Sequence, residues 1–558
     1  MARWLAVQGA DPAGTARAAG ADPVAELPGI ALALLRDERP RRPAGPWRHG
    51  DLVAVGEATL WNRRELEALL GAPPGEEDGA LLLALLATRG TAGLTHAHGA
   101  FALAVAGPAG IQLIRDAIGE RTLFHSAGAA SSSLRALRRL PGFAARPDLD
   151  SVRAFLTFAY VPGEGTLLEG VQELRPGTTL WLGAPAAESW WEPAEGGAPS
   201  DFAAILEQAV RERLPAGRPV AVLLSGGIDS SAVTALAARD HDAPVRTYAI
   251  SFGDDAPSER GYAELVAAHC GVPHTALVVD GATVAARLPA AMALLDDPVG
   301  DPLTVPNVLL DEAAAADGHD VLLNGEGGDP VLGGPKNLAM LIDELLPDER
   351  PSRSASYLRS YRKLGDRLDS FLTDDARAAL AGAPPLTRHV APYLEDGAPM
   401  TDLLHRLLHA NLRTKGAHHI LPKVDRLTAA AGLEGRSPLF DRRLVEAAFA
   451  APPQAKLDGH REKGLLKDAV AALLPATVVE RPKSGMRVPV QDWLDGSLRE
   501  LARDLLLGRR VRERGILRRE PIEALLRGEG SLYPRHGQQV WLLLSLELWL
   551  RAFVDGAP

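Results

Sequence analysis

Apolar and polar residues alternate differently in the early and later parts of the chain. In the first part, short apolar runs between turn residues predict strands at 52–55, 101–105 and 111–114. Apolar residues at helical spacing predict helices at 63–70 and 79–88. Many strands with few helices are typical of a layered α+β domain.

The pattern changes after Gly183–Ser200, a stretch rich in proline, glycine and alanine. The elements expected beyond it are helices at 201–214, 230–239 and 262–270 and strands at 220–224 and 245–251. Strand, glycine-rich turn and helix in this order predict a parallel, doubly wound α/β sheet. We therefore expect one domain over residues 1–190 and a second over residues 200–558, mostly helical from Ser352 onward.

Composition and charge narrow the class of protein. Hydrophobic residues make up 46% and charged residues 23%, as in globular proteins, and the net charge of −11 argues against nucleic acid as a partner. The single cysteine, Cys270, excludes an intrachain disulfide. Val540–Val554 is too short and too charged to span a bilayer and is interpreted as an amphipathic, largely buried helix. With no signal-peptide pattern, we expect a cytoplasmic protein without a membrane partner.

A glycine-rich string links the expected strand at 220–224 to the helix that follows. In Leu224-Ser225-Gly226-Gly227-Ile228-Asp229-Ser230-Ser231, two glycines let the backbone approach an anion, while the helix N-terminus and three serines supply donors. A glycine pair alone more often just turns the chain. The full string resembles the PP-loop of ATP pyrophosphatases, which implies cleavage of ATP between its α- and β-phosphates. It lacks Walker-loop spacing, so transfer of the γ-phosphoryl group is not implied.

A second glycine-rich turn, Asn324-Gly325-Glu326-Gly327-Gly328-Asp329, follows the apolar strand expected at 321–323. Open α/β sheets bind ligands at the carboxyl ends of their strands. Glu326 and Asp329 would bring carboxylates to a site built for phosphates. That is chemically sensible if Mg²⁺ bridges them to the phosphates or if one acts as a base.

Six ordered motifs of the second domain resemble the asparagine synthetase family, class B-like. They are the two turns above, Asp296-Asp297-Pro298, the region Lys423–Asp441, Glu462–Lys467 and Arg481–Gly485. Asn324 and Pro330 depart from the motif of the family, which has Ser and Glu there. The resemblance implies a PP-loop ATP pyrophosphatase domain, like the adenine nucleotide α hydrolases, with a helical C-terminal part.

The resemblance also implies roles for single residues, with ATP and Mg²⁺ as cofactors. Nucleotide binding would fall to Leu224, Ser225, Gly226, Gly227, Asp229, Ser230, Ser231, Ile250, Gly325, Asp329 and Lys463, with Asp229 and Asp329 holding the metal. Lys483 would stabilise the acyl-adenylate and the developing oxyanion, and Glu326 would accept the proton of the amine. The alternatives without a catalytic role are a solvated lysine at 483, a turn cap at 326, and a structural ion pair of Glu434 with Arg436.

The first domain resembles the glutaminase domain of the same family, an α+β sandwich of the N-terminal-nucleophile-hydrolase type. The matching strings are Val55–Asn62, Gly99–Ala102 and Arg115–Leu123. Glutamine hydrolysis in this family needs a cysteine exposed by loss of the initiator methionine, but Ala2 stands there. Val55 replaces the oxyanion-hole asparagine, the Arg-Gly-Pro-Asp clamp is missing, and Cys270 is interpreted as a buried helix-end residue. We therefore predict a degenerate glutaminase.

Relatives without glutaminase chemistry include β-lactam and carbapenam synthetases and lasso-peptide macrolactam cyclases, whose substrates carry their own amine. We expect a synthetase that adenylates the carboxylate of a small molecule or peptide, releases AMP and pyrophosphate, and forms an amide, by ring closure in specialised metabolism. Glu326, where β-lactam synthetases resemble the motif with Tyr, disfavours a β-lactam product. A lasso cyclase would add a leader-peptide-binding or protease partner.

Three alternatives stay open: an asparagine synthetase that uses free ammonia, a tRNA-modifying PP-loop enzyme and an inactive scaffold. The basic stretch Arg350–Arg388 would form a lid or peptide-binding surface, or else a plain solvated helical face.

Overall fold

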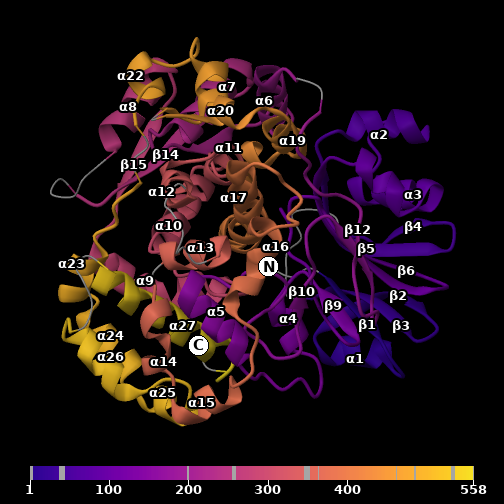
Figure 1. The fold of residues 1–558 in the computed structure, drawn as a ribbon. Coiled ribbons are helices and arrows are strands. Elements are labelled where there is room, and N and C mark those ends of the chain that lie inside the picture. Colours follow the sequence, from indigo (N-terminus) through magenta and orange to yellow (C-terminus); the bar gives the residue numbers. More distant parts are fainter. Residues whose placement is uncertain are drawn as a thin grey trace. The chain divides into compact units, whose positions relative to one another are not determined.

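The computed structural model describes residues 4–36, 44–197, 200–253, 259–344, 352–361, 363–459, 461–482, 485–529 and 535–556 (Figure 1). The chain forms two compact units, of which the first comprises Met1–Arg146 and Gly163–Pro193 and the second comprises Pro147–Pro162 and Ala194–Pro558. The segment Pro147–Pro162, which the sequence analysis includes in the first domain, thus packs with the second unit.

The first unit contains two antiparallel sheets of six strands each. In order across the first sheet, the strands are β10 (Gln172–Glu173), β8 (Phe124–Ser126), β9 (Ala129–Ser131), β1 (Trp4–Gln8), β3 (Ile30–Leu35) and β2 (Ala21–Leu27). Across the second they are β12 (Glu188–Ser189), β11 (Thr178–Trp181), β7 (Gly110–Arg115), β6 (Gly99–Gly107), β5 (Leu52–Leu60) and β4 (Trp47–His49).

The core of this unit lies between the two sheets. Side chains such as Trp4 and Leu32 from the first sheet and Val55 and Leu113 from the second belong to one buried cluster. The helices of the unit are α1 (Pro12–Ala18), α2 (Arg63–Leu70), α3 (Asp78–Arg89), η1 (Thr91–His96) and α4 (Leu134–Arg138). Helix α1 packs on strands of the first sheet and α3 on strands of the second (Figure 1). The layered α+β prediction is confirmed, and the predicted strands and helices fall within β5, β6, β7, α2 and α3.

The second unit is built on a parallel sheet in the order β15-β14-β13-β16-β17. Its strands are β13 (Val220–Leu223), β14 (Val245–Ser251), β15 (His274–Val278), β16 (Val321–Leu323) and β17 (Glu434–Arg436). The chain starts in the centre with β13, proceeds outward through β14 and β15, and then returns to add β16 on the other side of β13. This reversal is a topological switch point, where doubly wound sheets bind ligands outside the carboxyl ends of the strands.

Helices connect and extend this sheet. Those up to the second glycine-rich turn are α5 (Leu149–Phe158), α6 (Phe202–Arg211), α7 (Ile228–Asp240), α8 (Arg260–His269), α9 (Gly281–Leu294), α10 (Thr304–Ala316) and α11 (Gly328–Leu332). Next come α12 (Pro335–Glu344), α13 (Arg353–Tyr361), η2 (Gly365–Arg367), α14 (Leu368–Phe371), α15 (Asp374–Ala379), η3 (Leu386–His389), α16 (Ala391–Leu394), α17 (Leu403–Asn411), the π-helical η4 (Leu412–Ile420) and α18 (Leu421–Ala431).

The last part holds η5 (Pro438–Phe440), α19 (Arg442–Ala450), α20 (Pro453–Lys456), the short hairpin β18 (Leu457–Asp458) and β19 (Arg461–Glu462), α21 (Gly464–Val470), α22 (Ala476–Val479), α23 (Val490–Asp495), α24 (Arg499–Leu506), α25 (Arg509–Arg514), α26 (Arg519–Leu526) and α27 (Arg535–Phe553). Helices dominate from Ser352 onward, as predicted.

Helix α27 differs from its prediction in one respect. Every residue from Val540 to Leu550 is buried, so the helix is central to the unit and not amphipathic. Its buried Glu547 is compatible with that position because Arg514 and Arg551 both form ion pairs with it. None of the helices in the described residues has the length and apolar character needed to cross a membrane.

Candidate active site

The turn after β13 is a tight loop held by hydrogen bonds within itself. Gly226 has a φ of +77°, and a Cβ there would lie 2.6 Å from the backbone nitrogen of Ala263, so the turn requires glycine. The Ser225 backbone N–H donates to Ser230 Oγ at 3.1 Å, and Ser230 Oγ donates to the carbonyl of Gly227 at 3.2 Å. Within the described residues no side chain caps the start of α7, which leaves its first N–H groups available to an anion.

The turn after β16 packs directly on the first turn. A Cβ on Gly325 would lie 2.5 Å from the backbone nitrogen of Ser230, and a Cβ on Gly328 would lie 2.1 Å from Oδ1 of Asp229. A side chain at residue 325 would therefore push the two backbones apart, and one at residue 328 would displace the Asp229 carboxylate. The glycines of the second turn set the distance between the two loops.

Asn324 closes the second turn. Its Oδ1 accepts a hydrogen bond from the backbone N–H of Glu326 at 3.0 Å, and Asn324 itself is buried. The side chain of Glu326 is half-buried and lines the cavity described below. Asparagine at 324 can thus supply the turn-closing acceptor at the position where the resembled motif has serine.

One lysine lies between the carboxylates of the two turns. Lys463 is fully buried with a φ of +58°, and its Nζ lies 2.5 Å from Oδ2 of Asp229 and 2.6 Å from Oδ1 of Asp329. Two carboxylates beside a phosphate-shaped loop suit Mg²⁺ that also takes phosphate oxygens as ligands. The described residues contain no cluster of three or more His, Cys, Asp or Glu able to hold a metal by themselves. The residues therefore fit a cation shared with phosphates.

The two turns line a cavity of about 290 Å³, here called the loop cavity. Its lining includes most of the residues selected from the sequence: Leu224, Ser225, Gly227, Asp229, Ser230, Ile250, Gly325, Glu326 and Asp329. Three others are placed differently. Gly226 shapes the turn, Ser231 is buried within α7, and Lys463 reaches the site through the two carboxylates.

Lys483 lies outside the described residues, but residues on either side of it contact the site. Arg481 donates to the carbonyl of Gly226 at 3.3 Å, pairs with Glu259 at 2.5 Å, and lies over the Tyr262 ring at 3.9 Å from its centroid. Gly485 is in the wall of the loop cavity. Arg481 is thus anchored on the first turn.

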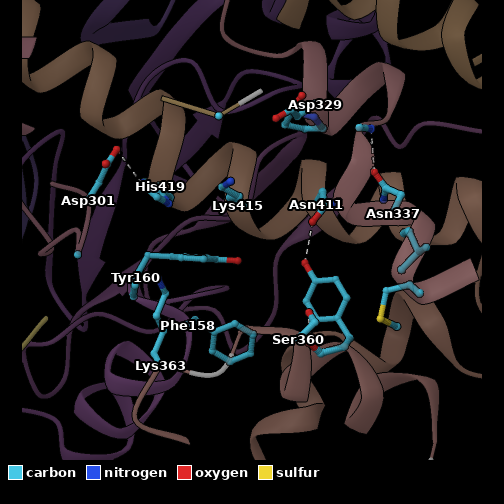
Figure 2. A pocket seen from close by; sticks show the side chains of 18 of the residues that line it. Phe158, Tyr160, Asp301, Asp329, Asn337, Ser360, Lys363, Asn411, Lys415 and His419 are labelled. Carbon is cyan, nitrogen blue, oxygen red and sulfur yellow. Dashed lines mark hydrogen bonds and ion pairs between the residues drawn. The ribbon is translucent and has the colours of Figure 1, made fainter. Parts of the chain in front are cut away.

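A charged cluster, of which only Lys423 belongs to one of the sequence motifs, forms another wall. Lys423 Nζ lies 2.6 Å from Oδ2 of Asp301, and His419 Nε2 lies 3.8 Å from the same oxygen (Figure 2). Burial alone would raise the pKa of Asp301, but the Lys423 and His419 contacts hold that pKa well below its usual range. Burial works against the Lys423 charge as well, yet Asp301 and Glu326 raise its pKa.

His419 is uncharged at neutral pH in this cluster. Burial lowers its pKa to about 4, although the hydrogen bond and charge of Asp301 act in the opposite direction. Its ring also lies against that of Tyr160, with centroids 5.4 Å apart. A neutral imidazole therefore faces the cavity beside an ionised carboxylate.

Four side chains near the cavities, of which only Lys423 was part of a sequence motif, follow one line along a continuous helical segment. Asn411, Lys415, His419 and Lys423 are four residues apart, and they run from α17 through the π-helical η4 into α18. A step of four exceeds the 3.6 residues of an α-helical turn and falls short of the roughly 4.4 of a π turn. Successive side chains of this series therefore rotate in one direction along the α-helical parts and in the other along the π-helical part. The four side chains, here called the helical column, stay on one face of the segment. This spacing is the sequence signal that could have identified these residues.

A second cavity, of about 490 Å³, adjoins the first and is here called the aromatic cavity. It shares six wall residues with the loop cavity: Asp301, Asp329, Pro330, Lys415, His419 and Gly485. Its other walls include Phe158, Tyr160, Met340, Tyr357 and Leu407, which belong to one buried cluster. Figure 2 shows Asn411, Lys415 and His419 on one side of the cavity and Phe158 and Tyr160 on the other.

Two further sets of residues have structural roles. Arg436 pairs with Glu434 at 2.9 Å and donates to the carbonyl of Arg213 at 2.6 Å, which confirms the interpretation of a structural ion pair. In the first unit, the buried Asp116 accepts hydrogen bonds from the backbone N–H groups of residues 118–121. The Arg115–Leu123 string therefore stabilises a loop.

Comparison with known proteins agrees with this geometry. Residues 201–551 match the family described as Asparagine synthase, and residues 46–191 match the Glutamine amidotransferase domain. The first match covers more than half of the chain. The protein belongs to the asparagine synthase family. It is an ATP-dependent C–N ligase with an amidotransferase-like first unit and a PP-loop second unit.

The relatives of this protein are not all named for the same activity. A Mycobacterium tuberculosis protein provisionally named asparagine synthetase (glutamine-hydrolyzing) is 28% identical, over 94% of this chain and 88% of its own. Asparagine synthetase (glutamine-hydrolyzing) 1 of Bacillus subtilis is 22% identical, over 72% of this chain and 68% of its own. The carboxyethyl-arginine beta-lactam-synthase of Streptomyces clavuligerus is 26% identical, over 78% and 73%.

The amidotransferase-like unit of this family member has no thiol. Cys270, the single cysteine of the sequence, follows α8 in the second unit, and burial raises the pKa of its thiol. Val55 is fully buried in the core between the two sheets. Position 2, where the sequence has alanine, lies outside the described residues.

Proposed function

We propose that the protein adenylates the carboxylate of a substrate and joins it to an amine that the same substrate carries, with release of AMP and pyrophosphate. Ring closure of a small molecule or peptide, as in a lasso-peptide macrolactam, is the form that we favour. The observation that carries this proposal is the shared wall of the two cavities. A nucleotide phosphate in the loop cavity and a carboxylate in the aromatic cavity would both lie against the residues that the two cavities share.

The first turn would bind the pyrophosphate part of ATP. The Ser225 and Ser230 hydroxyls and the start of α7 supply donors, and Leu224, Ile250 and Gly325 would border the adenosine. Mg²⁺ held by Asp229 and Asp329 would neutralise phosphate charge as the bond between the α- and β-phosphates breaks. Lys463 keeps these two carboxylates oriented and partly neutralised.

Formation of the amide needs an oxyanion partner and a proton acceptor. We assign the first role to Lys483, because its neighbours Arg481 and Gly485 contact the first turn and line the cavity. Glu326 lines the loop cavity and is our candidate acceptor for the proton of the attacking amine. Replacement of Lys483 by alanine should leave ATP binding intact and lower product formation by about 100-fold or more.

The absence of a thiol in the first unit supports an amine source other than glutamine. The fold of the unit is retained, but hydrolysis of glutamine in the family needs a cysteine nucleophile. We expect no glutamate from glutamine, ATP and Mg²⁺. Measurable glutamate formation by the purified protein would contradict this part of the proposal.

The deciding experiment measures pyrophosphate release with ATP and Mg²⁺ in three mixtures: L-aspartate alone, L-aspartate with ammonium chloride, and carboxylic acids with hydroxylamine as the amine. Ammonia-dependent asparagine formation would identify an asparagine synthetase that uses free ammonia, the alternative favoured by the names of several relatives. Hydroxamate formation only with larger acids would support the proposal. No pyrophosphate in any mixture would overturn it.

A further inference from the structure

Two asparagines in the wall of the aromatic cavity have their side-chain oxygens engaged with the protein. Oδ1 of Asn337 accepts from the backbone N–H of Gly334 at 3.0 Å, and Oδ1 of Asn411 accepts from the hydroxyl of Tyr357 at 2.7 Å (Figure 2). A backbone N–H can only donate, so it fixes the orientation of the Asn337 amide, and Tyr357 holds Asn411 in the same way. In both residues the –NH₂ group is therefore the part that remains for a ligand.

The two side-chain nitrogens are open hydrogen-bond donors. Among the described residues, no hydrogen-bond partner is found for Nδ2 of Asn337 or for Nδ2 of Asn411. Both nitrogens retain exposed surface, because neither is among the fully buried polar atoms of the described residues that lack a partner. Asn337 as a whole is nevertheless only 5% exposed. An amide donor in such a place is unfavourable without a partner, and a ligand in the cavity would supply one.

A structural role accounts for the two oxygens but not for the two nitrogens. Asn337 is the third residue of α12, and its contact with Gly334 resembles one half of a capping box, in which glutamate or glutamine accepts from the backbone N–H before the helix. That contact needs an acceptor alone, and so does the hydroxyl of Tyr357. Aspartate would serve at both positions, whereas asparagine adds a donor that faces the cavity.

The two amides come from neighbouring helices and lie beyond the wall that the two cavities share. Asn337 is one turn before Met340 on α12, Asn411 is one turn after Leu407 on α17, and Met340 and Leu407 belong to one buried cluster. Both asparagines line the aromatic cavity but not the loop cavity, whereas Lys415, the next residue of the helical column, lines both. The donors therefore face a part of a ligand that is removed from the nucleotide.

We propose, on the basis of the adenylating function above, that Asn337 and Asn411 form a donor pair that binds a carbonyl oxygen of the substrate at a distance from the carboxylate that reacts. With the reacting carboxylate at the shared wall, the distal carbonyl would accept from the two –NH₂ groups. The substrate class is accordingly a peptide or an N-acylated amino acid, in which an amide carbonyl lies near the carboxylate.

The chemistry of the donors favours an amide carbonyl over a second carboxylate. Both donors are neutral, so they compensate a carboxylate only in part for the water that it loses, whereas an amide carbonyl loses less hydration when it enters the cavity. Lys363 also lines this cavity, so a second carboxylate is the other source of such an oxygen. The experiment below distinguishes the two sources.

Three phenyl-bearing acids test the donor pair by calorimetry with the full-length protein, Mg²⁺ and a non-hydrolysable ATP analogue. 4-Phenylbutanoate has no distal oxygen, N-benzoylglycine has an amide carbonyl in place of the methylene group next to the ring, and phenylsuccinate carries a second carboxylate. We expect N-benzoylglycine to bind about tenfold more tightly than 4-phenylbutanoate. Tighter binding of phenylsuccinate alone would retain the donor pair and assign a dicarboxylate. Equal binding of all three acids would overturn the inference.

Variants of the two asparagines should remove this preference. Asn337→Asp and Asn411→Asp keep the oxygens that accept from Gly334 and Tyr357, but each replaces a donor by a charged oxygen. We expect the preference for N-benzoylglycine over 4-phenylbutanoate to fall to about threefold or less in each. The added charge acts on the carboxylates of both ligands, so 4-phenylbutanoate is the internal control. Asn411→Leu, which adds no charge, should reduce the ratio as well. A preference that survives in all three variants would overturn the inference.

Pyrophosphate release with ATP, Mg²⁺ and hydroxylamine separates this inference from the function on which it rests. Preferential binding of N-benzoylglycine without pyrophosphate release in any mixture would retain the donor pair and remove the adenylating function. Pyrophosphate release with L-aspartate and ammonia, without preferential binding of N-benzoylglycine or phenylsuccinate, would retain the amide-forming function and remove the donor pair.

Discussion

A side chain on Gly328 would place its Cβ 2.1 Å from Oδ1 of Asp229. The two residues follow different strands, β16 and β13, on the two sides of the switch point. Their contact brings two carboxylate-bearing turns close enough for one ammonium group, that of Lys463, to bind both. The position of the Asp229 carboxylate thus depends on the absence of a Cβ at residue 328.

Substitution of this glycine should therefore impair chemistry more than folding. In Gly328→Ala the methyl group would displace the Asp229 carboxylate, so we expect carboxylate-dependent pyrophosphate release to fall by about 100-fold, as for loss of one positioned charged group in an active site. Gly261→Ala, at a position with open space around the new Cβ, is the matched control. Activity of Gly328→Ala within threefold of this control would show that the Asp229 carboxylate can be displaced without loss.

Removal of the bridging ammonium group should make stability depend on Mg²⁺. Lys463→Met leaves the Asp229 and Asp329 carboxylates together without their shared cation. Because the Asp329 side chain is 45% exposed, the loss in free energy of unfolding should be smaller than the about 3–5 kcal/mol of fully buried pairs. A divalent cation can replace that charge, so we expect MgCl₂ to raise the melting temperature of Lys463→Met more than that of the wild type.

Lys467→Met is the control for that experiment. Lys467 is also buried, one turn further along α21. Its replacement leaves the two carboxylates and Lys463 in place, and Mg²⁺ should affect it as it affects the wild type. Equal responses of the Lys463→Met and Lys467→Met proteins to Mg²⁺ would contradict a role of Lys463 in neutralising the carboxylates.

The pair of Asp301 and Lys423 should show strong coupling in a double-mutant cycle. Either single change, Asp301→Asn or Lys423→Met, leaves one buried charge without its partner and should lower the free energy of unfolding by about 3–5 kcal/mol. The double variant has neither charge and should recover most of that loss. The exposed pair of Arg218 and Asp320 provides the contrast, since Asp320→Asn should cost under about 1 kcal/mol. Additive losses in the first cycle would contradict direct coupling.

Local sequence patterns were sufficient to predict the two turns of the site, but not the residues that line the rest of its cavities. Ser225–Ser230 and Asn324–Asp329 could be predicted because each turn is one continuous string between a strand and a helix. Asp301 could not be predicted, and neither could Lys415 and His419, because Asp301 lies more than 100 residues before η4, which carries the two others, and no motif joins them before folding. The four-residue spacing of the helical column is informative only when a π-helical segment is anticipated.

The parts of the fold that could not be predicted from the sequence have a similar cause. Strands β8 to β12 contain two to four residues each, too few for a period-two pattern to stand out. The segment Pro147–Pro162 joins the second unit through tertiary packing that no local pattern reports. The stretch Arg350–Arg388, expected as a lid or a solvated face, in fact contributes Tyr357, Ser360 and Lys363 to the aromatic cavity.

His419 should make the protein less stable in mild acid. Burial lowers its pKa to about 4, whereas an imidazole in the unfolded chain has a pKa of about 6.5. Between these values the unfolded chain binds more protons, so this contribution to stability is fully present above pH 6.5 and is lost as the pH falls toward 4. Asp301 opposes the shift, and Lys423 and Lys415 add to it.

The difference between the folded and unfolded pKa values of His419 determines how much stability is lost. A histidine with these two pKa values contributes about 2 kcal/mol less to the free energy of unfolding at pH 5 than at pH 7. His419→Gln has no titrating ring, so urea unfolding of this variant should lose about 2 kcal/mol less than the wild type over that range. Parallel pH profiles for the two proteins would mean that folding does not lower the pKa of His419.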